Sequence, residues 1–368
     1  MSLGIYLHVP FCKSKCPYCD FYSVPLPEDD LLDRYVACLI ERMRPYRGEA
    51  ADTLYFGGGT PSLLGGERIA RLIGAAADCF GLTNAEITLE INPGDPALPL
   101  LRTFRQAGGN RLSIGLQSGN PALLHTLGRR HSPADFLACA EAAARVGLTN
   151  LSADWMLALP GGTAEPDPTV LPLLRQAGVR HVSAYLLKTE PGTPFFARRH
   201  TLALPDEEQT AAQYLAAAAL LRQNGWQQYE ISNFAVPGFE SRHNLKYWNA
   251  EPYLGFGPAA HSFYNGRRFA FARDLAAFLQ GAEPVPAAPD PDIPDGSPAE
   301  YLMLRLRLTA GLSEAAFAAR FGRPIPAEWR QRAARIPAAL LCCDGQGLRL
   351  TPEGFLVSNA VLRQLLAL

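Results

Sequence analysis

The sequence predicts an α/β fold in which parallel strands with outer helices precede a small C-terminal α+β unit. From residue 4 to about 232, short apolar stretches alternate with longer stretches of helical periodicity. Repeated βα units of this kind form parallel sheets covered by helices. Near the C-terminus, helical stretches precede a hairpin instead. The alternation alone leaves open a whole or partial barrel and an open doubly wound sheet.

The predicted strands are short apolar runs separated by longer helical stretches. They span residues 4–8, 53–56, 86–91, 111–115, 151–156 and 181–187, with a seventh candidate at 226–231. Apolar residues recur with helical spacing between them. These helices are expected at 29–44, 67–80, 134–146 and 206–223.

Changes in composition along the chain predict four parts. They are a βα core at 1–232, an aromatic- and glycine-rich extension at 233–280, a Pro/Asp-rich linker or surface loop at 281–298, and a C-terminal domain at 299–368. The last part is expected to resemble a winged helix. Its predicted elements are helices at 298–308, 313–321, 328–340 and 352–366, with a hairpin turn at 344–347.

Composition narrows the function classes. The chain has 368 residues, of which 48% are hydrophobic and 19% charged, so it can bury a large core and is not a disordered protein. A net charge of −1 disfavours a protein that coats nucleic acid. No apolar run approaches the roughly 18 residues of a membrane span. The first residues lack the pattern of a secretory signal. We therefore expect a cytoplasmic protein.

Three of the eight cysteines are crowded into one C-x3-C-x2-C segment, Cys12, Cys16 and Cys19. Three thiolates in a short loop can converge on a soft metal centre. A structural zinc site would need a fourth ligand, for which His8 or Asp20 is available. An iron–sulfur cluster held by only three cysteines would keep one iron open for a chelating substrate.

The spacing of these cysteines resembles that of the radical S-adenosylmethionine superfamily. An aromatic residue, Tyr18, precedes the last cysteine, and the segment follows the first strand of a βα series. The resemblance implies a 4Fe–4S cluster on the three cysteines, with S-adenosylmethionine chelated to its unique iron. It also implies a partial or complete parallel (β/α) barrel, which selects the barrel over the doubly wound sheet.

Polar and glycine residues follow the predicted strands at points where a barrel places its ligands. Gly57-Gly58-Gly59-Thr60-Pro61 follows the second strand, and side-chain-free residues let a ligand approach the backbone. Four polar residues lie at later strand ends, where an unpaired charge would be costly. They are Glu90, Gln117, Arg129 and Asp154.

Nearly the whole chain resembles the oxygen-independent coproporphyrinogen III oxidase group and its paralogue, the haem chaperone (HemW) family. The resemblance implies that Tyr6, Tyr18, Gly58 and Glu90 contact cluster-bound S-adenosylmethionine. It implies that the position of a second such molecule is lined by Gly59, Thr60, Gln117, Arg129 and Asp154. The family's DLIYGLPG segment is here DWMLALPG, with Trp155 and Ala158 as departures.

Three features favour the chaperone branch over the oxidase. The oxidase has a fourth cysteine where this chain has Phe21, and an N-terminal arm where this chain starts on the first strand. His243-Asn-Leu-Lys-Tyr247-Trp248 resembles the HNxxYW motif of the chaperones. We therefore expect a haem chaperone with His243 as haem ligand and His261 and His8 as further candidates; the alternative is the oxidase. On residues alone, a structural cluster of these side chains that closes the barrel is favoured.

The remaining expectations concern partners. The chaperone interpretation implies haem as cargo and an acceptor protein, which could be membrane-bound and hold this protein at the membrane periphery. Arginines of the C-terminal part are diluted by acidic residues, so we expect no nucleic-acid partner, although a zinc-stabilised winged-helix regulator is a third interpretation. A homodimer could use exposed aromatics of 247–271. Enzymatic activity stays open, with oxidase activity expected to be absent.

Overall fold

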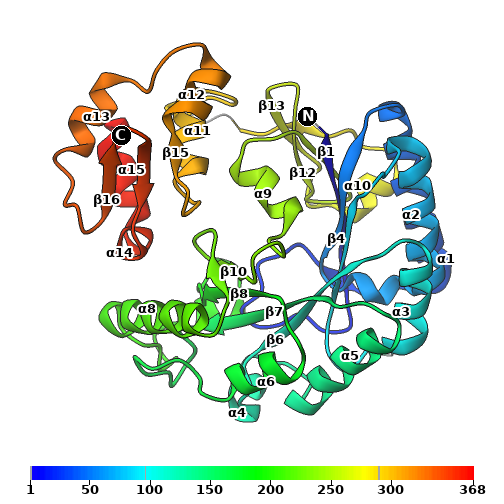
Figure 1. The fold of residues 1–368 in the computed structure, drawn as a ribbon. Coiled ribbons are helices and arrows are strands. Elements are labelled where there is room, and N and C mark those ends of the chain that lie inside the picture. Colours follow the sequence, from blue (N-terminus) through cyan, green and yellow to red (C-terminus); the bar gives the residue numbers. More distant parts are fainter. Residues whose placement is uncertain (1, 96, 289–290) are drawn as a thin grey trace.

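The computed structural model describes residues 2–95, 97–288 and 291–368, and within them the chain forms a curved sheet covered by helices (Figure 1). Its strands lie in the order β14-β13-β12-β11-β1-β4-β5-β6-β7-β8-β10-β9. The parallel part matches the predicted strands closely. It consists of β1 (Leu3–Val9), β4 (Ala51–Gly58), β5 (Glu86–Ile91), β6 (Arg111–Gln117), β7 (Asn150–Leu157) and β8 (His181–Leu186).

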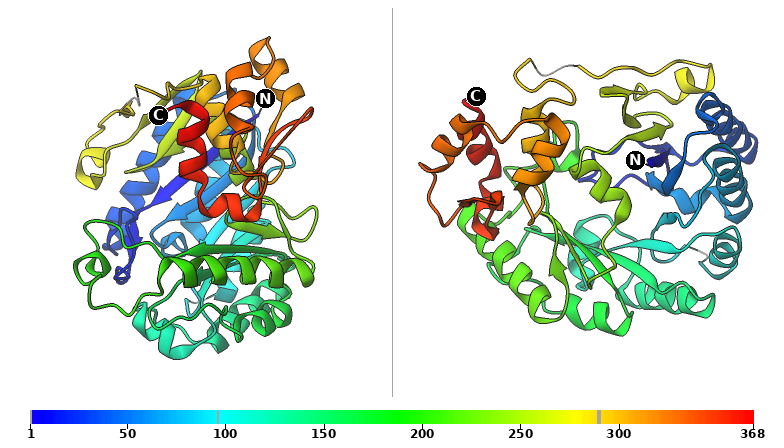
Figure 2. Two further views of the ribbon diagram at one scale, coloured as in Figure 1. Left: turned by 90° about the vertical axis from the view of Figure 1, so that its left-hand side faces the viewer. Right: turned by 45° about the horizontal axis from the view of Figure 1, so that its top comes forward.

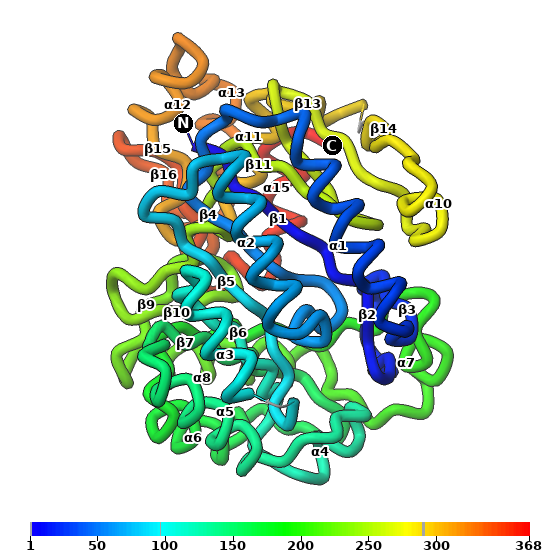
Figure 3. Tube along the Cα trace, turned by 90° about the vertical axis from the view of Figure 1, so that its right-hand side faces the viewer, coloured from blue at the N-terminus to red at the C-terminus, as the bar shows by residue number. Residues whose placement is uncertain are grey.

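Helices that alternate with these strands cover the outer face of the sheet (Figure 3). Each buries an apolar stripe against the strands, as the periodicity predicts. Capping boxes start two of them, through Ser132 with Asp135 and Asp206 with Gln209. The helices are α1 (Asp29–Met43), α2 (Gly66–Phe80), α3 (Ala97–Gln106), α5 (Pro133–Arg145), α6 (Val170–Gln176) and α8 (Glu207–Gln223).

Mainly antiparallel strands extend both edges of the parallel part. Next to β1, β11 (Tyr253–Phe256) is parallel, and β12 (His261–Tyr264), β13 (Arg267–Ala270) and β14 (Val285–Pro286) follow antiparallel. The aromatic- and glycine-rich segment therefore continues the central sheet. Since the sheet ends at β14 on one edge and at β9 on the other, the described chain forms a partial barrel (Figure 2).

The expectation of a seventh parallel strand at 226–231 is wrong. Only β9 (Gln227–Gln228) is a strand there, and it pairs antiparallel with β10 (Asn233–Ala235), which itself pairs antiparallel with β8. The chain reverses direction in a hairpin, where the amide of Tyr229 donates to the carbonyl of Asn233 over 3.1 Å. Because a hairpin without a crossover helix joins β9 to β10, β10 runs antiparallel to β9, and it is β10 that pairs with β8.

The C-terminal unit packs helices around a small sheet in the order β15-β17-β16. The third helix ends at Ala333, earlier than predicted, four residues before Pro337. The expected last helix is broken at Val357, whose backbone leaves helical geometry at φ −115° and ψ 22°. The elements are α11 (Pro298–Arg305), β15 (Leu312–Ser313), α12 (Glu314–Phe321), α13 (Ala327–Ala333), β16 (Leu341–Asp344), β17 (Gly347–Leu350), α14 (Pro352–Leu356) and α15 (Ser358–Leu366).

This unit docks on the barrel at its open side (Figures 1 and 2). Arg320 donates to the carbonyl of Ala250 over 3.1 Å, and the Arg307 guanidinium lies 5.3 Å from the ring centre of Trp248. A single apolar core runs through both parts. Some arginines of the C-terminal unit therefore make contacts within the protein. Among the described residues, no helix has both the length and the apolar character needed to cross a membrane.

Short elements complete the connections. They are β2 (Phe11–Cys12), β3 (Val24–Pro25), α4 (Pro121–Thr126), α7 (Pro194–Ala197), α9 (Arg242–Trp248), α10 (Leu275–Leu279) and the 3-10 turns η1 (Arg44–Tyr46) and η2 (Pro61–Leu64).

Candidate functional site

A cavity lies at the carboxyl ends of the parallel strands, where the cysteine loop covers them. Ligand sites of parallel barrels are found at this end. Eleven of the residues singled out in the sequence line it together, although they come from six different segments. They are Cys12, Cys16, Tyr18, Cys19, Gly58, Gly59, Thr60, Glu90, Gln117, Arg129 and Asp154.

The cysteine loop is anchored at both ends and in its middle. Its ends, β2 and β3, pair with each other, and the amide of Cys19 donates to the carbonyl of Cys16 over 3.1 Å. Tyr18 packs against Phe195 of α7, whose own amide donates to the carbonyl of Pro17. The three cysteines are free and half-buried. Burial raises the pKa of the Cys12 and Cys19 thiols.

The glycine segment after β4 forms a cradle beside the first cysteine. The amides of Gly59 and Thr60 donate to the carbonyls of Val9 and Phe11, both over 2.8 Å. A Cβ at Gly59 would lie 3.0 Å from the Cys12 sulfur and 2.7 Å from the Phe11 carbonyl oxygen. Only glycine therefore allows this close approach.

The three cysteine side chains are of the ligand type that an iron–sulfur cluster requires. Three thiols, the ligands that iron–sulfur clusters use, surround one cavity that also has a side-chain-free wall. The sulfurs are not drawn together: among the described residues, no three His, Cys, Asp or Glu side chains converge as ligands of one metal ion would.

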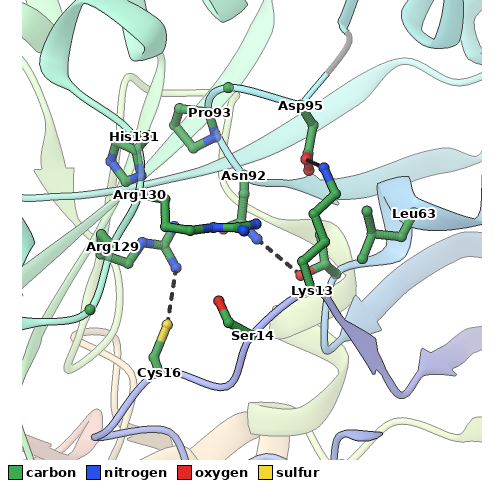
Figure 4. A pocket seen from close by; sticks show the side chains of 13 residues that line it. Lys13, Ser14, Cys16, Leu63, Asn92, Pro93, Asp95, Arg129, Arg130 and His131 are labelled. Carbon is green, nitrogen blue, oxygen red and sulfur yellow. Dashed lines mark hydrogen bonds and ion pairs between the residues drawn. The ribbon is translucent and has the colours of Figure 1, made fainter. Parts of the chain in front are cut away.

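One side of the cavity is a polar network centred on Arg129 (Figure 4). Its guanidinium donates to Asn92 Oδ1, to the carbonyl of Gly115 over 2.8 Å and to the Cys16 sulfur at 3.9 Å. Asn92 in turn donates to Thr60 Oγ1 over 3.0 Å. The sequence analysis missed Asn92. Its signal was its place at the end of β5, two residues after Glu90.

A second opening of the cavity lies beyond this network. Cys16, Thr60, Asn92 and Arg129 line both parts, and a Lys13–Asp95 ion pair of 2.8 Å bounds the outer part (Figure 4). Arg130 and His131 project there as well (Figure 4). The polar wall is therefore continuous from the cysteine loop to the molecular surface.

Two carboxyl groups face the cavity without a salt-bridge partner among the described residues. Glu90 accepts from Tyr55 Oη over 2.9 Å and from the Gly58 amide over 3.3 Å, and Asp154 accepts from Ser113 Oγ at 3.4 Å. Burial, aided by Asp154, raises the pKa of Glu90 to about 7. Burial raises the pKa of Asp154 to about 6, although Arg129 opposes this. Such a pair favours a cationic ligand.

Gln117 closes the far wall of the cavity. It is the last residue of β6 and has a φ of 66°, and its Oε1 accepts from Tyr185 Oη over 2.8 Å. Tyr185 lies on β8, which β7 separates from β6; it also lines the cavity and was missed in the sequence. Its only signal was an aromatic residue near the end of a predicted strand.

Tyr6 lies one layer behind the cavity wall. Its hydroxyl is 3.1 Å from His8 Nδ1, and its ring centre lies 6.1 Å from that of Tyr55 and 6.4 Å from that of His243, which are 5.1 Å from each other. It does not line the cavity with the cysteines. The contact of Tyr6 with S-adenosylmethionine stays a prediction.

His243 lies on α9, inside the barrel and away from the cavity. It is 1% exposed, and both ring nitrogens are engaged, Nδ1 with Thr53 Oγ1 at 2.8 Å and Nε2 with Tyr247 Oη at 2.7 Å. Burial, together with Lys246, lowers its pKa to about 3. In this arrangement the imidazole has no lone pair open to a ligand.

The aromatic residues around this motif are also packed inward. Tyr253, Phe263 and Phe271 are buried, and the other aromatic rings of 247–271 are at least half-buried. In the described part of this segment no aromatic side chain is mostly exposed, and a homodimer contact through it stays a prediction.

Comparisons with known proteins agree with this geometry. The radical SAM superfamily profile matches residues 6–171, and that of the HemN C-terminal domain matches residues 297–357. The fold is similar to that of coproporphyrinogen III oxidase (HemN) from Escherichia coli, with a TM-score of 0.80 and 20% identity, over 99% of this chain and 90% of that one.

Two curated relatives are similar over nearly their full length. The heme chaperone HemW of Mycobacterium tuberculosis is 38% identical over 99% of this chain and 94% of its own length. The heme chaperone HemW of Escherichia coli is 35% identical over 99% of this chain and 98% of its own. With its cysteine loop, glycine cradle and C-terminal unit in these places, the chain belongs to the HemW family of radical SAM proteins.

Proposed function

We propose that the protein is a haem chaperone that binds a 4Fe–4S cluster, S-adenosylmethionine and haem, and transfers the haem to an acceptor protein. One observation carries the proposal. The chain is 35% identical to the HemW protein of Escherichia coli but 20% identical to the HemN protein of the same organism. This contrast favours the chaperone over the alternative, an oxygen-independent coproporphyrinogen III oxidase.

Cys12, Cys16 and Cys19 would hold the cluster. When bound, it supplies an iron with an open position and one electron for reductive chemistry on a chelated ligand. The protein supplies a half-buried loop fixed by β2, β3 and α7, and Arg129 beside one of the sulfurs. Its guanidinium would stabilise the negative charge of the thiolate.

The rest of the cavity suits S-adenosylmethionine, which carries a sulfonium, an ammonium and a carboxylate. Glu90 and Asp154 would attract the cationic groups, and their raised pKa values indicate that this charge is unpaired before binding. Gly58 and Gly59 line the cavity without side chains, which leaves room for the amino-acid end. Thr60, Gln117 and Arg129 would line a second position of the same kind.

Haem is proposed as cargo rather than as a resident group. The acceptor would be a haemoprotein, and a membrane-bound acceptor would bring this protein to the membrane periphery. We expect no nucleic-acid partner, since arginines of the C-terminal unit bind protein groups, as Arg330 does with Glu314. The domain boundaries at residues 232, 280 and 298 remain our proposal for the limits of the functional parts.

The test is a haem titration of cluster-reconstituted protein without oxygen, followed by transfer to apomyoglobin and, in parallel, an assay with coproporphyrinogen III. We expect saturable binding of one haem per chain, release to the apoprotein and no decarboxylation. Decarboxylation without saturable haem binding would establish the oxidase instead.

A further inference from the structure

A second pocket lies beside the cysteine loop, against the inner face of β1, where Tyr6 and His8 line it. Its cavity volume is about 350 Å³, within the range of roughly 300–1,000 Å³ typical of small-molecule sites. Its walls are mainly aromatic, from Tyr6, Phe21, Tyr22, Tyr247, Tyr253 and Phe271. The proposed cluster and S-adenosylmethionine site does not include this pocket.

The hydroxyl groups of these tyrosines are occupied by protein partners. Tyr247 Oη pairs with His243, Tyr253 Oη accepts from Arg268 over 3.1 Å, and Tyr22 Oη accepts from the Leu275 amide over 2.9 Å. The pocket is therefore walled mainly by ring carbons. A flat apolar ligand gains free energy from burying its faces on such rings.

One histidine of the pocket is open for coordination. His261, at the start of β12, is exposed and lines the pocket, and in the part of the chain that the structure describes its imidazole makes no hydrogen bond. His8 lines the same pocket but is 4% exposed, and its ring nitrogens contact Tyr6 Oη at 3.1 Å and the Tyr22 carbonyl at 3.0 Å. Burial and Arg268 lower the pKa of His261, so it is neutral at pH 7 and can bind a metal.

A positively charged side chain, that of Arg273, lines the same pocket. Arg273 has a side chain that is 55% exposed, and its polar partner among the described residues is Asp20, through the backbone carbonyl and through the carboxylate at 3.5 Å. Such an exposed pair is weak, so an incoming carboxylate can replace Asp20. The only other charged group in the lining is Asp20 itself, because His8 and His261 are neutral.

Phe21 connects this pocket to the cysteine cavity. It lines both, and its side chain is the most exposed of the large hydrophobic residues described, at 66%. This is the position where the related oxidase has a fourth cysteine. An exposed phenyl ring at the junction is costly in water unless a ligand or partner covers it.

We propose that this pocket holds the haem, with His261 as iron ligand, Arg273 as partner of a propionate and Phe21 against the macrocycle. The proposal rests on the proposed function and adds its binding site. His243 is then a positioning residue, because it fixes Tyr247, whose ring packs 4.5 Å from Tyr253 in the pocket wall. Partial exposure of the haem suits a carrier that must release it.

The experiment is a haem titration followed by Soret absorbance, with spectra of the cluster-loaded protein subtracted. The variants are His261→Ala, Tyr247→Phe and, as an exposed control outside the pocket, His200→Ala. We expect His261→Ala to shift the Soret band and weaken binding about tenfold or more, which corresponds to the loss of an axial ligand. Tyr247→Phe should keep the ligand spectrum, and His200→Ala should equal the wild type. With His261→Gly, added imidazole should restore the wild-type band.

The outcomes separate the two proposals. Wild-type protein that binds one haem, with an unchanged band in His261→Ala, would overturn this site and leave the chaperone function standing. A lost band in His243→Ala together with an unchanged one in His261→Ala would return the ligand to α9. Wild-type protein without saturable haem binding would overturn the proposed function, and this site with it.

Discussion

The cysteine cavity and the cluster around His243 are both polar and both built on the same sheet, yet their side chains differ in what they leave open. In the cavity, three free thiols, Glu90 and Asp154 face open space with few partners. Around His243, every polar atom of the imidazole is hydrogen bonded and the ring is 1% exposed. In a ligand site, some polar groups lack partners within the protein and can bind a ligand. In a structural cluster, the polar groups are hydrogen bonded to one another. Mutations should therefore affect ligand content in the first region and folding stability in the second.

The largest expected effect is on the cysteine loop. Replacing Cys12, Cys16 and Cys19 together with serine should abolish bound iron and sulfide, because a hydroxyl is a poor ligand for iron–sulfur clusters. Unfolding of the unreconstituted protein should change little, since all three side chains are half-buried. Iron and sulfide analysis after reconstitution measures the effect, and Cys343→Ser, at an exposed cysteine, is the control. One zinc per chain without sulfide in the wild type would refute the cluster.

The next effect should appear at His243. His243→Ala removes hydrogen bonds to Thr53 and Tyr247 and leaves a buried cavity, so we expect a loss of about 3 kcal/mol in unfolding free energy. Urea denaturation measures it, with His200→Ala as an exposed control. An unchanged midpoint would show that the cluster around His243 is not structural and would break the comparison.

The same histidine should also give a pH signature. Its pKa in the native state is about 3, lowered from the ordinary value of about 6.5. Below pH 6.5 the unfolded chain binds a proton that the native state does not, so stability falls as pH decreases. The slope is about 1.4 kcal/mol per pH unit for this one group. His243→Gln should make the acid dependence shallower by that amount.

Glu90 should show the opposite slope. Its native pKa of about 7 exceeds the ordinary value of about 4.3, so the unfolded chain loses its proton first as pH rises. Stability of the ligand-free protein should decrease by about 1.4 kcal/mol per pH unit between these values. In Glu90→Gln this decrease should be missing, as denaturation midpoints at pH 5, 6 and 7 would show. An equal slope in both proteins would mean that the carboxylate is already paired.

The sequence could predict those features that have a local signal along the chain, but not those that depend on contacts between distant residues. The parallel strands were located within a few residues, because buried strands are continuous apolar runs. The cavity residues were found through spacing and strand-end position, which are local signals. Asn92 and Tyr185 were missed because they matter only through contacts across strands. The hairpin at Tyr229 depends on its hydrogen bond with Asn233, and the hydrogen bonding of both His243 ring nitrogens depends in part on Thr53. No pattern in the sequence indicates that these residues contact each other.

The smallest expected effect concerns the strained backbone at the strand ends. Ala158 follows β7 with a φ of 57°, and its amide donates to Gln213 Oε1 over 2.6 Å, which holds that geometry. The family motif has glycine here. Ala158→Gly loses a buried methyl group but relieves left-handed strain of about 1–2 kcal/mol, so the two terms should nearly cancel.

Ala143→Gly provides the matched comparison for this position. Ala143 is also buried, but it lies within the helix α5, where glycine is unfavourable by about 1 kcal/mol in addition to the lost methyl group. Thermal unfolding should therefore separate the two variants clearly, with Ala158→Gly near the wild type and Ala143→Gly lower. Equal losses in both would mean that Ala158 is not strained, and that the departure from glycine has no energetic cost at the end of β7.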